Sequence, residues 1–388
     1  MASEVGGAAR FIPGTGGNVL LLSMRRISDL VAYSLAYELE DVVAELTLAD
    51  RVEADNFPAM EQSRKAYKLV RFATGSPRVA RTLAPNCSTV QLSRNYDLFF
   101  PAFNHTYELY SLATIPDWRK RSRVAACFIT EIWPHLLPRY LLEMLREFDH
   151  IFTGFSQCVD EVSRIVGRPC TYLPVASNVL RFAPTSLSEP RLIDVCNIGR
   201  RSAVTHEALL KLADERKIFY YYDTVAASGE GNKQRTFRVD NASEHRRMFA
   251  NLLRHSRYYI ANRSRINEPE LTQGKDEISS RYYEGAAAGT VMLGEVPRTA
   301  EFATQFDWPD AVIHLPFDSP DIGRILADID ADQERIARIR RQNIQQAALR
   351  HDWVHRLQTV FDMVGIKPTS GMIERQSRLQ GLAGQLET

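Results

Sequence analysis

The sequence predicts an α/β protein with two parallel-sheet domains of similar size. Short apolar segments typical of buried strands alternate with segments of helical period, a pattern that favours parallel sheets. The alternation stops at residues 183–192, a polar segment with two prolines that is typical of a linker, and then restarts. We therefore expect an N-terminal domain over residues 18–182 and a C-terminal domain over residues 193–348.

The N-terminal domain is expected to follow a disordered lead-in over residues 1–17, a small-residue and Gly-rich stretch. This stretch lacks the basic region and apolar core of a signal peptide. Apolar runs mark the strands of the domain, and apolar residues repeated every three or four positions mark its helices. The expected strands are residues 18–23, 41–46, 96–103, 124–131, 150–155 and 172–175, and the expected helices are residues 27–40, 67–72, 137–148 and 156–166.

The C-terminal domain shows the same alternation. Its strands are short and apolar throughout, as parallel strands buried on both faces should be. Residues 349–388 are expected to be helical, with a first helix over residues 351–361 and an exposed final helix after Gly371. The expected strands are residues 193–199, 219–222, 258–261, 291–293 and 311–315, and the expected helices are residues 206–215, 243–254, 279–288, 332–348 and one from Asp321.

Bulk composition is that of an ordinary globular protein. Of the 388 residues, 45% are hydrophobic and 24% are charged, and the net charge of +1 gives no overall basic field for nucleic acid. The five cysteines are scattered, without a Cys-x-x-Cys pair or a Cys/His metal spacing, which suits a reducing cytosol. No apolar run reaches the roughly 18–20 residues that a membrane span needs. Two Asp-x-Asp strings within residues 328–332 are interpreted as solvated helical charge, so no metal site is expected.

One local basic run, Trp118–Arg123, carries four cationic side chains. We interpret it as a solvated loop before a strand. The alternative is contact with anionic lipid headgroups or with an acidic acceptor, which would place the protein peripherally at a membrane face.

The most informative segment is Lys275–Val296, KDEISSRYYEGAAAGTVMLGEV. It predicts an acidic loop, a short helix, a small-residue turn and a buried strand. Ser279 or Ser280 can cap the helix by accepting a hydrogen bond from a free backbone N–H. The N-terminus of a helix favours anions. Glu284 lies in the middle of the helix, where a carboxylate can accept hydrogen bonds from vicinal hydroxyls.

A second acid, Asp276 or Glu277, lies about two turns before Glu284, at the mouth of the helix. Together these groups would suit a nucleotide-sugar diphosphate. The alternative is structural. Glu277–Arg281 and Arg281–Glu284 have the spacing of surface salt bridges that contribute about 0.2–0.5 kcal/mol each.

The same segment resembles the signature of GT-B glycosyltransferases of the family 1/family 4 kind, roughly acid-x7-E-A-x-A-x-G-T-P-V-V. Asp276 lies eight positions before Glu284 and matches the first acid, although the family usually has Glu there. Gly285 replaces the usual Ala, and Val291 replaces the usual Pro. The Ser-Arg-Tyr-Tyr-Glu variant is similar to the group 1 glycosyl transferases with a CgeB-type C-terminal half. The resemblance covers residues from Phe148 to about Ile366; before that, only the order of elements fits.

This resemblance implies the GT-B fold, in which two Rossmann-like domains face a cleft and the C-terminal helices, here within residues 349–388, cross back to the N-terminal domain. The C-terminal domain would then hold a nucleotide sugar, such as a UDP- or GDP-hexose, as substrate and not as a cofactor. On that basis Glu284 is expected to bind ribose hydroxyls, and Asp276 or Glu277 the hydroxyls of the transferred sugar.

Four basic side chains are expected near the donor diphosphate. Arg200 and Arg201 follow a strand that ends at Gly199, on a loop where the family has diphosphate-binding residues, and the planar guanidinium suits phosphate. Lys275 and Arg281 flank the second donor loop and could neutralise the leaving group. A fifth, Arg263, follows the strand over residues 258–261, at an end where open α/β sheets bind ligands.

The N-terminal domain is expected to supply the acceptor site. Glu131 and His135 follow the strand over residues 124–131 and could position or deprotonate an acceptor hydroxyl. The alternative for Glu131, which is close to Trp133 in sequence, is an ordinary contact between domains.

The predicted function is transfer of a hexose from a nucleotide-diphosphate sugar to a hydroxyl of a glycan, a lipid or a small molecule in the cytoplasm. The resemblance implies a metal-independent reaction and favours retention at the anomeric carbon. Two alternatives stay open: a nucleotide-sugar epimerase on the same fold, and a non-catalytic nucleotide-sugar-binding protein of a surface-glycan system.

Overall fold

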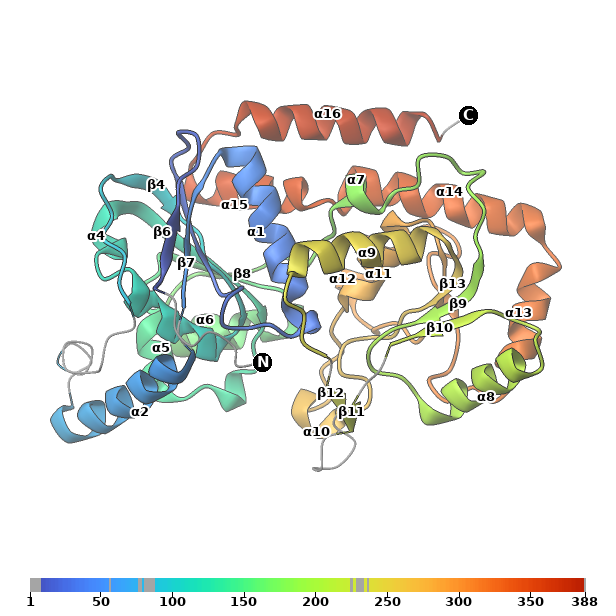
Figure 1. Ribbon diagram of the computed structural model, residues 1–388, viewed down its shortest axis with the longest axis horizontal. Helices are drawn as coiled ribbons and strands as arrows, with labels where there is room; N and C mark the ends of the chain where they lie inside the picture. Colours follow the sequence, from blue (N-terminus) through green and yellow to red (C-terminus); the bar gives the residue numbers. More distant parts are fainter. Residues whose placement is uncertain are drawn as a thin grey trace. The chain divides into compact units, whose positions relative to one another are not determined.

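The computed structural model describes residues 8–55, 57–75, 79, 88–223, 226–227, 234–235 and 237–386. The chain divides into two compact units, each described here by itself (Figure 1). Unit 1 comprises the chain up to Asp29 together with Ala36–Pro174 and Leu357–Ile373. Unit 2 comprises Leu30–Leu35, Val175–Arg356 and the chain from Glu374 onwards. Each unit is built on a parallel sheet, which confirms the predicted α/β class with two Rossmann-like domains.

The sheet of unit 1 has the strand order β1-β3-β2-β4-β6-β7-β8, with β5 also paired to β6. All pairs are parallel except β1–β3. Its interior strand β2 has five buried residues, because helices cover both faces of a parallel sheet. The strands are β1 (Arg10–Ile12), β2 (Val19–Ser23), β3 (Asp50–Glu53), β4 (Tyr96–Phe99), β5 (Ala102–His105), β6 (Ser122–Glu131), β7 (His150–Thr153) and β8 (Cys170–Tyr172).

The helices of unit 1 connect these strands, as the alternating pattern predicted. Aromatic packing fixes part of the core, where the ring of Trp118 stacks on Phe148 at 5.1 Å and lies 4.9 Å from Phe99. The helices are α1 (Ser34–Thr47), α2 (Phe57–Thr74), α4 (Trp118–Arg121), α5 (Arg139–Leu145) and α6 (Val159–Val166), and the 3-10 turns are η2 (Thr106–Thr114), η3 (Pro134–Leu136) and η4 (Ser156–Cys158). The 3-10 turn η1 (Val31–Tyr33), which precedes α1, belongs to unit 2.

Three expectations for unit 1 are wrong. Residues 41–46 belong to helix α1 and not to a strand, because Leu39, Val42, Val43 and Leu46 bury one helical face. The expected strand over residues 96–103 is two strands, separated at Pro101, which has no N–H to donate. The expected disordered lead-in contains β1, which pairs antiparallel with β3; residues 1–7 lie outside the described part.

The sheet of unit 2 has the order β10-β9-β13-β14-β15, parallel throughout. Helices lie on both faces of this sheet (Figure 1). Val195, Tyr258 and Leu293 pack in a cluster with residues of α8 and α13. The strands are β9 (Ile193–Asn197), β10 (Tyr220–Tyr222), β13 (Ser256–Ile260), β14 (Val291–Gly294) and β15 (Ile313–His314), with a separate antiparallel pair β11 (Ala226–Ala227) and β12 (Gln234–Arg235).

Helices α9 and α11 cover the other face of this sheet. Met292 and Tyr259 contact the position of Gly285 in α11 so closely that a side chain there would collide with Met292. This close approach explains why glycine stands where the family signature usually has alanine. The helices of unit 2 are α7 (Val179–Phe182), α8 (Ala203–Asp214), α9 (Ala242–Arg254), α10 (Pro269–Thr272), α11 (Ser280–Ala287), α12 (Ala300–Gln305), α13 (Ile322–Asp330) and α14 (Gln333–Arg350).

The C-terminal helices α15 (Trp353–Val364) and α16 (Ser370–Gly384) are divided between the units. Residues Leu357–Ile373 belong to unit 1, where Thr369 Oγ1 donates to the carbonyl of Leu46 at 2.6 Å. In unit 2, Arg375 of α16 forms a buried ion pair with Asp352 at 2.7 Å. The expectation of an exposed final helix is therefore wrong, because α16 buries this ion pair as well as Leu379.

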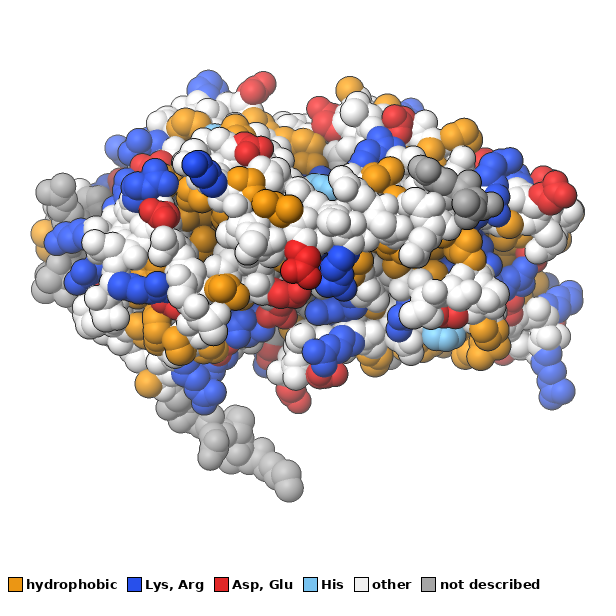
Figure 2. Space-filling model, turned by 90° about the horizontal axis from the view of Figure 1, so that it is seen from above, with side chains coloured by type: hydrophobic (Ala, Val, Ile, Leu, Met, Phe, Trp, Pro, Cys, Tyr) orange, Lys and Arg blue, Asp and Glu red, His pale blue; other side chains and the backbone are white. Residues whose placement is uncertain are grey.

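The surface charge, the helix hydropathy and the cysteines of the described residues agree with what the composition predicts. Acidic and basic side chains are interspersed on the face seen in Figure 2. Within the described ranges, every helix is too short or too polar to serve as a membrane span. Cys87 lies outside the described residues, and Cys127, Cys158 and Cys196 are buried free thiols.

Candidate functional site

The carboxyl edge of the sheet in unit 2 gathers most of the predicted donor residues. The loops after β9, β10, β13 and β14 all leave at this edge because the strands are parallel, and open α/β sheets bind ligands there. The loop after β9 carries Gly199, Arg200 and Arg201, and the N-terminus of α11 adjoins it through Arg281.

A tight turn at Gly199 fixes the first loop. Gly199 has a φ of +76°, a conformation that favours glycine, and its N–H donates to Asp223 Oδ1 at 2.8 Å. Arg201 lies back over the ring of Tyr222 and donates to the carbonyl of Asn197 at 3.1 Å and to Asp223 Oδ1 at 3.0 Å. Its side chain is only 9% exposed, so Arg201 holds the loop in place through Asp223.

Arg200, on the loop after β9, and Arg281, in the first turn of α11, contact different partners. Arg200 pairs with Glu268 at 2.7 Å and remains partly exposed. Arg281, in the first turn of α11, donates from Nε and Nη2 to the carbonyl of Ile198 at 3.2 and 3.0 Å. A side chain at position 199 would meet Arg281 Nη2 at 2.5 Å, so the glycine also makes room for this guanidinium.

The N-terminus of α11 is not capped in the way we predicted. Ser279 occupies the N-cap position, but its hydroxyl donates to the carbonyl of Asn262 at 2.7 Å and accepts no helix N–H. Ser280 Oγ instead donates to Glu284 Oε2 at 3.4 Å. The prediction that Ser279 or Ser280 caps the helix is therefore wrong, because Ser279 accepts no helix N–H and Ser280 already lies within the helix.

Glu284 lies deeper than its place in the signature suggested. Its side chain is 5% exposed, and Oε1 accepts a hydrogen bond from Arg246 Nη1 at 2.5 Å. The guanidinium of Arg246 lies against the rings of Phe182 and Phe249, at 4.9 and 5.5 Å from their centroids. Arg246 was not predicted as a site residue, because nothing near position 246 in the sequence links it to Glu284.

The predicted surface salt bridges are also wrong. Glu277 and Glu284 are 1% and 3% exposed, so neither can form a solvent-exposed pair with Arg281. Burial here results from the loop before α11, which folds so that the N–H of Ser264 donates to the carbonyl of Glu277 at 2.8 Å.

The remaining predicted residues lie along the loop before α11. Asp276 Oδ1 forms an ion pair with Arg263 Nη1 at 2.9 Å, and both side chains are 25% exposed. Its other oxygen, Oδ2, lies 3.4 Å from the backbone nitrogen of Arg298. Lys275 is partly buried on the same loop. Asp276 and Arg263 are therefore brought together, whereas Glu277 points into the protein interior.

A histidine beside this edge was also missed. His245, next to Arg246 on α9, packs its ring against Phe249 and Phe237. Burial, and then the positive charge of Arg246, lowers the pKa of His245 to about 4, while Asp223 opposes the shift. The imidazole is therefore neutral at physiological pH. A histidine on the buried face of a helix gives no such signal in the sequence.

The predicted acceptor residues lie at the carboxyl end of β6 in unit 1. Glu131 is the last residue of that strand, and its Oε1 accepts a hydrogen bond from the indole N–H of Trp133 at 2.7 Å. His135 lies in η3 and is exposed, with its ring 6.4 Å from that of Trp133.

A buried carboxyl group that was not predicted lies at the end of β2 in the same unit. Glu40 Oε2 accepts hydrogen bonds from Ser23 Oγ at 2.5 Å and Arg25 Nη2 at 3.0 Å. Burial raises the pKa of Glu40 to about 7, against the opposing effect of Arg25. The sequence placed residue 40 at the end of a helix and gave no reason to single it out.

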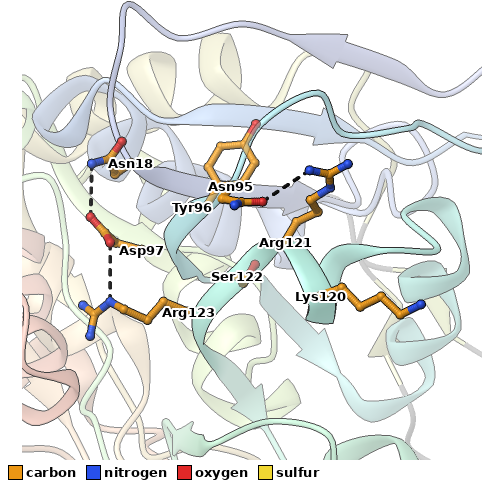
Figure 3. A pocket seen from close by; sticks show the side chains of 8 residues that line it. All are labelled: Asn18, Asn95, Tyr96, Asp97, Lys120, Arg121, Ser122 and Arg123. Carbon is orange, nitrogen blue, oxygen red and sulfur yellow. Dashed lines mark hydrogen bonds and ion pairs between the residues drawn. The ribbon is translucent and has the colours of Figure 1, made fainter.

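The basic run Trp118–Arg123 forms α4 and the start of β6, and its last four residues line an open cavity of about 310 Å3. Its side chains do not converge (Figure 3). Arg121 Nη1 lies 3.4 Å from Asn95 Oδ1, Arg123 Nε lies 3.4 Å from Asp97 Oδ1, and Lys120 points away from both. This arrangement favours solvated surface charge over a built anion site.

Comparison with known proteins supports the resemblance. Residues 198–362, which include the carboxyl edge from Ile198 onwards, match the model of a family described as glycosyl transferase-like. The predicted resemblance to glycosyltransferases is thereby confirmed for this part of the chain, which is less than half of its length; the CgeB-type subgroup stays a prediction. No curated protein matches the chain.

Two solved structures are similar in outline. A glycosyltransferase from Rickettsia africae ESF-5 is 10% identical, with 90% of this chain and 98% of that chain covered and a TM-score of 0.47. The Glycosylation Associate Protein (Gap123) complex from Streptococcus agalactiae is 13% identical, with 73% of this chain and 54% of that chain covered and a TM-score of 0.37.

Proposed function

We propose that the protein is a glycosyltransferase that moves a hexose from a nucleotide-diphosphate sugar to an acceptor hydroxyl. One observation supports this proposal above the others. The part of the chain that matches the glycosyl transferase-like family places Arg200, Arg263 and Arg281 on two loops and the first turn of α11, all at one edge of a parallel sheet.

The donor diphosphate would bind at this edge. Arg281 donates to a backbone carbonyl, and Arg200 and Arg263 pair with carboxylates that are themselves only partly buried, so each guanidinium can exchange its partner for phosphate oxygens. The backbone N–H groups of α11 would add donors, since the hydroxyl of the N-cap residue Ser279 accepts none of them. These groups would stabilise the charge that develops on the departing diphosphate.

The sugar and ribose would be oriented by the acids. Asp276 is the more accessible candidate for the transferred hexose, whereas Glu277 is buried. Glu284 Oε2 would reach ribose hydroxyls if Ser280, which lies 3.4 Å away, moved aside, and Arg246 would hold the carboxylate in position. Arg246 is thus a positioning residue for Glu284.

The acceptor hydroxyl would come from a glycan, a lipid or a small molecule, with Glu131 or His135 of unit 1 placing it. The transfer would be metal-independent, since guanidinium groups and helix N–H groups can supply the positive charge that the leaving group requires. Retention at the anomeric carbon follows from the family resemblance, and the scattered cysteines favour a cytoplasmic location.

Turnover tests the proposal directly. The full chain is incubated with UDP- and GDP-hexoses and a panel of glycan, lipid and small-molecule acceptors, and products are followed by mass spectrometry. Acceptor-dependent release of nucleoside diphosphate with a glycosylated product is expected. Isomerised nucleotide sugar without acceptor would indicate an epimerase instead. Binding without any product across the panel would indicate a non-catalytic nucleotide-sugar-binding protein.

A further inference from the structure

We infer that unit 2 has a second ligand site, for a small phosphate ester, at the amino edge of its sheet. A cavity of about 330 Å3 lies there, lined by residues 187–191, by the first residues of β13 and β14, and by α14. The proposed donor site lies at the opposite end of the same strands, so the two sites are separate. This inference does not depend on the transferase proposal.

Two arginines give the cavity its positive charge. Arg191 donates to the carbonyls of Ser256 at 2.6 Å and Ala288 at 2.8 Å, and its buried Nε has no hydrogen-bond partner. Arg340 of α14 donates from Nη2 to the carbonyl of Leu187 at 2.9 Å, and its buried Nε is likewise unpartnered. Within the described part of the chain, neither guanidinium forms an ion pair with a carboxylate.

These two charges are close enough to repel each other. Burial and the charge of Arg340 lower the pKa of Arg191 to about 9, against the opposing effect of Glu189, and burial lowers the pKa of Arg340. Like charges that share a partly desolvated site are unfavourable unless an anion compensates them. A phosphate group between Arg191 and Arg340 would supply that compensation, since guanidinium forms strong, directional hydrogen bonds with phosphate oxygens.

The other charged groups at the cavity already have partners. Arg257 pairs with Asp194 at 2.8 Å and with Asp330. Glu189 is the one carboxylate among the lining residues; its Oε1 accepts from the N–H of Thr185 at 2.8 Å and from the hydroxyl of the same residue. The positive charge that lacks an ion-pair partner among the described residues is therefore that of Arg191 and Arg340.

Size and lining indicate an ester and not the free ion. The volume is at the lower end of the roughly 300–1,000 Å3 typical of small-molecule sites. Apolar side chains also line it, namely Val291 and Ile336, together with Tyr258. An organic group attached to the phosphate would contact these side chains, while the phosphate contacts the arginines.

Phosphorus NMR titrations of the full chain with glycerol 1-phosphate and with inorganic phosphate, at constant ionic strength, test the inference. Wild type is expected to bind the ester more tightly than the free ion. Arg340→Met should weaken binding of the ester by about tenfold or more, the loss expected for a charge-assisted hydrogen bond. Arg341→Met, an exposed neighbour on the same helix, should bind like wild type.

A gain of affinity provides the test that misfolding cannot mimic. Glu189→Gln removes the lining carboxylate, keeps an acceptor for Thr185, and should tighten binding of glycerol 1-phosphate severalfold. Absence of binding, equal affinity of Arg340→Met and wild type, or no gain in Glu189→Gln would overturn the site. Equal or tighter binding of inorganic phosphate would overturn its assignment to an ester.

Discussion

Arg246 and Glu284 form an ion pair inside unit 2, with 2.5 Å between Nη1 and Oε1 and side chains that are 4% and 5% exposed. The pair joins α9 to α11, the helix that carries the signature of the proposed donor site. Two phenylalanine rings flank the guanidinium of Arg246, so replacing the ion pair by hydrogen bonds to water is unfavourable at this buried position. The acid that the signature marks as a ligand is thus also a structural element of unit 2.

The first prediction follows from this burial. Arg246→Met should lower the free energy of unfolding by about 3–5 kcal/mol, because the carboxylate of Glu284 is left buried without its partner. The double variant Arg246→Met with Glu284→Leu should recover much of this loss. Urea unfolding followed by circular dichroism measures both.

The neighbouring residue provides a matched control. Arg247 pairs with Glu244 on the solvent side of α9, with both side chains 61% exposed. Arg247→Met should therefore change the free energy of unfolding by no more than about 1 kcal/mol. Equal losses for the two single variants would contradict the special role of the buried pair.

Much of this fold could be predicted from the sequence, because buried parallel strands are short apolar runs that stand out between helices. For that reason the apolar runs predict the positions of β9, β13 and β14 to within a few residues. The prediction of a strand over residues 41–46 is wrong because two adjacent valines suit a strand as well as a buried helical face.

The candidate site was predictable where residues follow a strand directly, as Arg200 and Arg263 do. Sequence could not show how deep a residue lies or which distant residue it meets. Glu284 and its partner are 38 positions apart, and they meet only because α9 and α11 cover the same face of the sheet. Glu40 was missed for the same reason, since its partners Ser23 and Arg25 lie on another element.

The second prediction concerns the turn after β9. Gly199→Ala should lower the free energy of unfolding by about 1–2 kcal/mol, because φ of +76° is unfavourable for alanine. It should also displace Arg281 from the carbonyl of Ile198 and weaken nucleotide-sugar binding. Gly274→Ala is the control: φ there is +79°, with no atom within 4 Å of the new methyl group. Thermal unfolding should show similar losses of stability for Gly199→Ala and Gly274→Ala. Calorimetric titration should show weaker nucleotide-sugar binding for Gly199→Ala only.

The third prediction concerns Glu40, whose pKa is raised by burial to about 7. A raised folded-state pKa means that the stability present below pH 4.5 is lost as the pH rises through about 7. Glu40→Gln cannot ionise, so it should become more stable relative to wild type between pH 5 and about pH 8. Melting temperatures of both proteins across this range measure the effect. A difference that does not change with pH would show that Glu40 ionises normally.

The fourth prediction concerns His245, whose pKa is lowered to about 4 by burial and by Arg246. The stability that this neutral imidazole contributes is complete above pH 6.5 and is lost as the pH falls towards 4. His245→Phe keeps the ring packing against Phe249 and should reduce the loss of stability over that range. Parallel acid titrations of unfolding free energy would refute this if their slopes were identical.

Nucleotide-sugar binding at the carboxyl edge of unit 2 is the central claim, and calorimetric titration of the full chain with UDP- and GDP-hexoses tests it most directly. Arg281 is the residue to change, because it is partly exposed. A Glu284 variant would also break the buried ion pair with Arg246 and so destabilise the protein. We predict that one nucleotide sugar binds wild type, that Arg281→Met weakens this binding by about tenfold or more, and that Arg324→Met, an exposed residue of α13, has no effect. Unchanged affinity in Arg281→Met, or no binding to wild type, would contradict the claim.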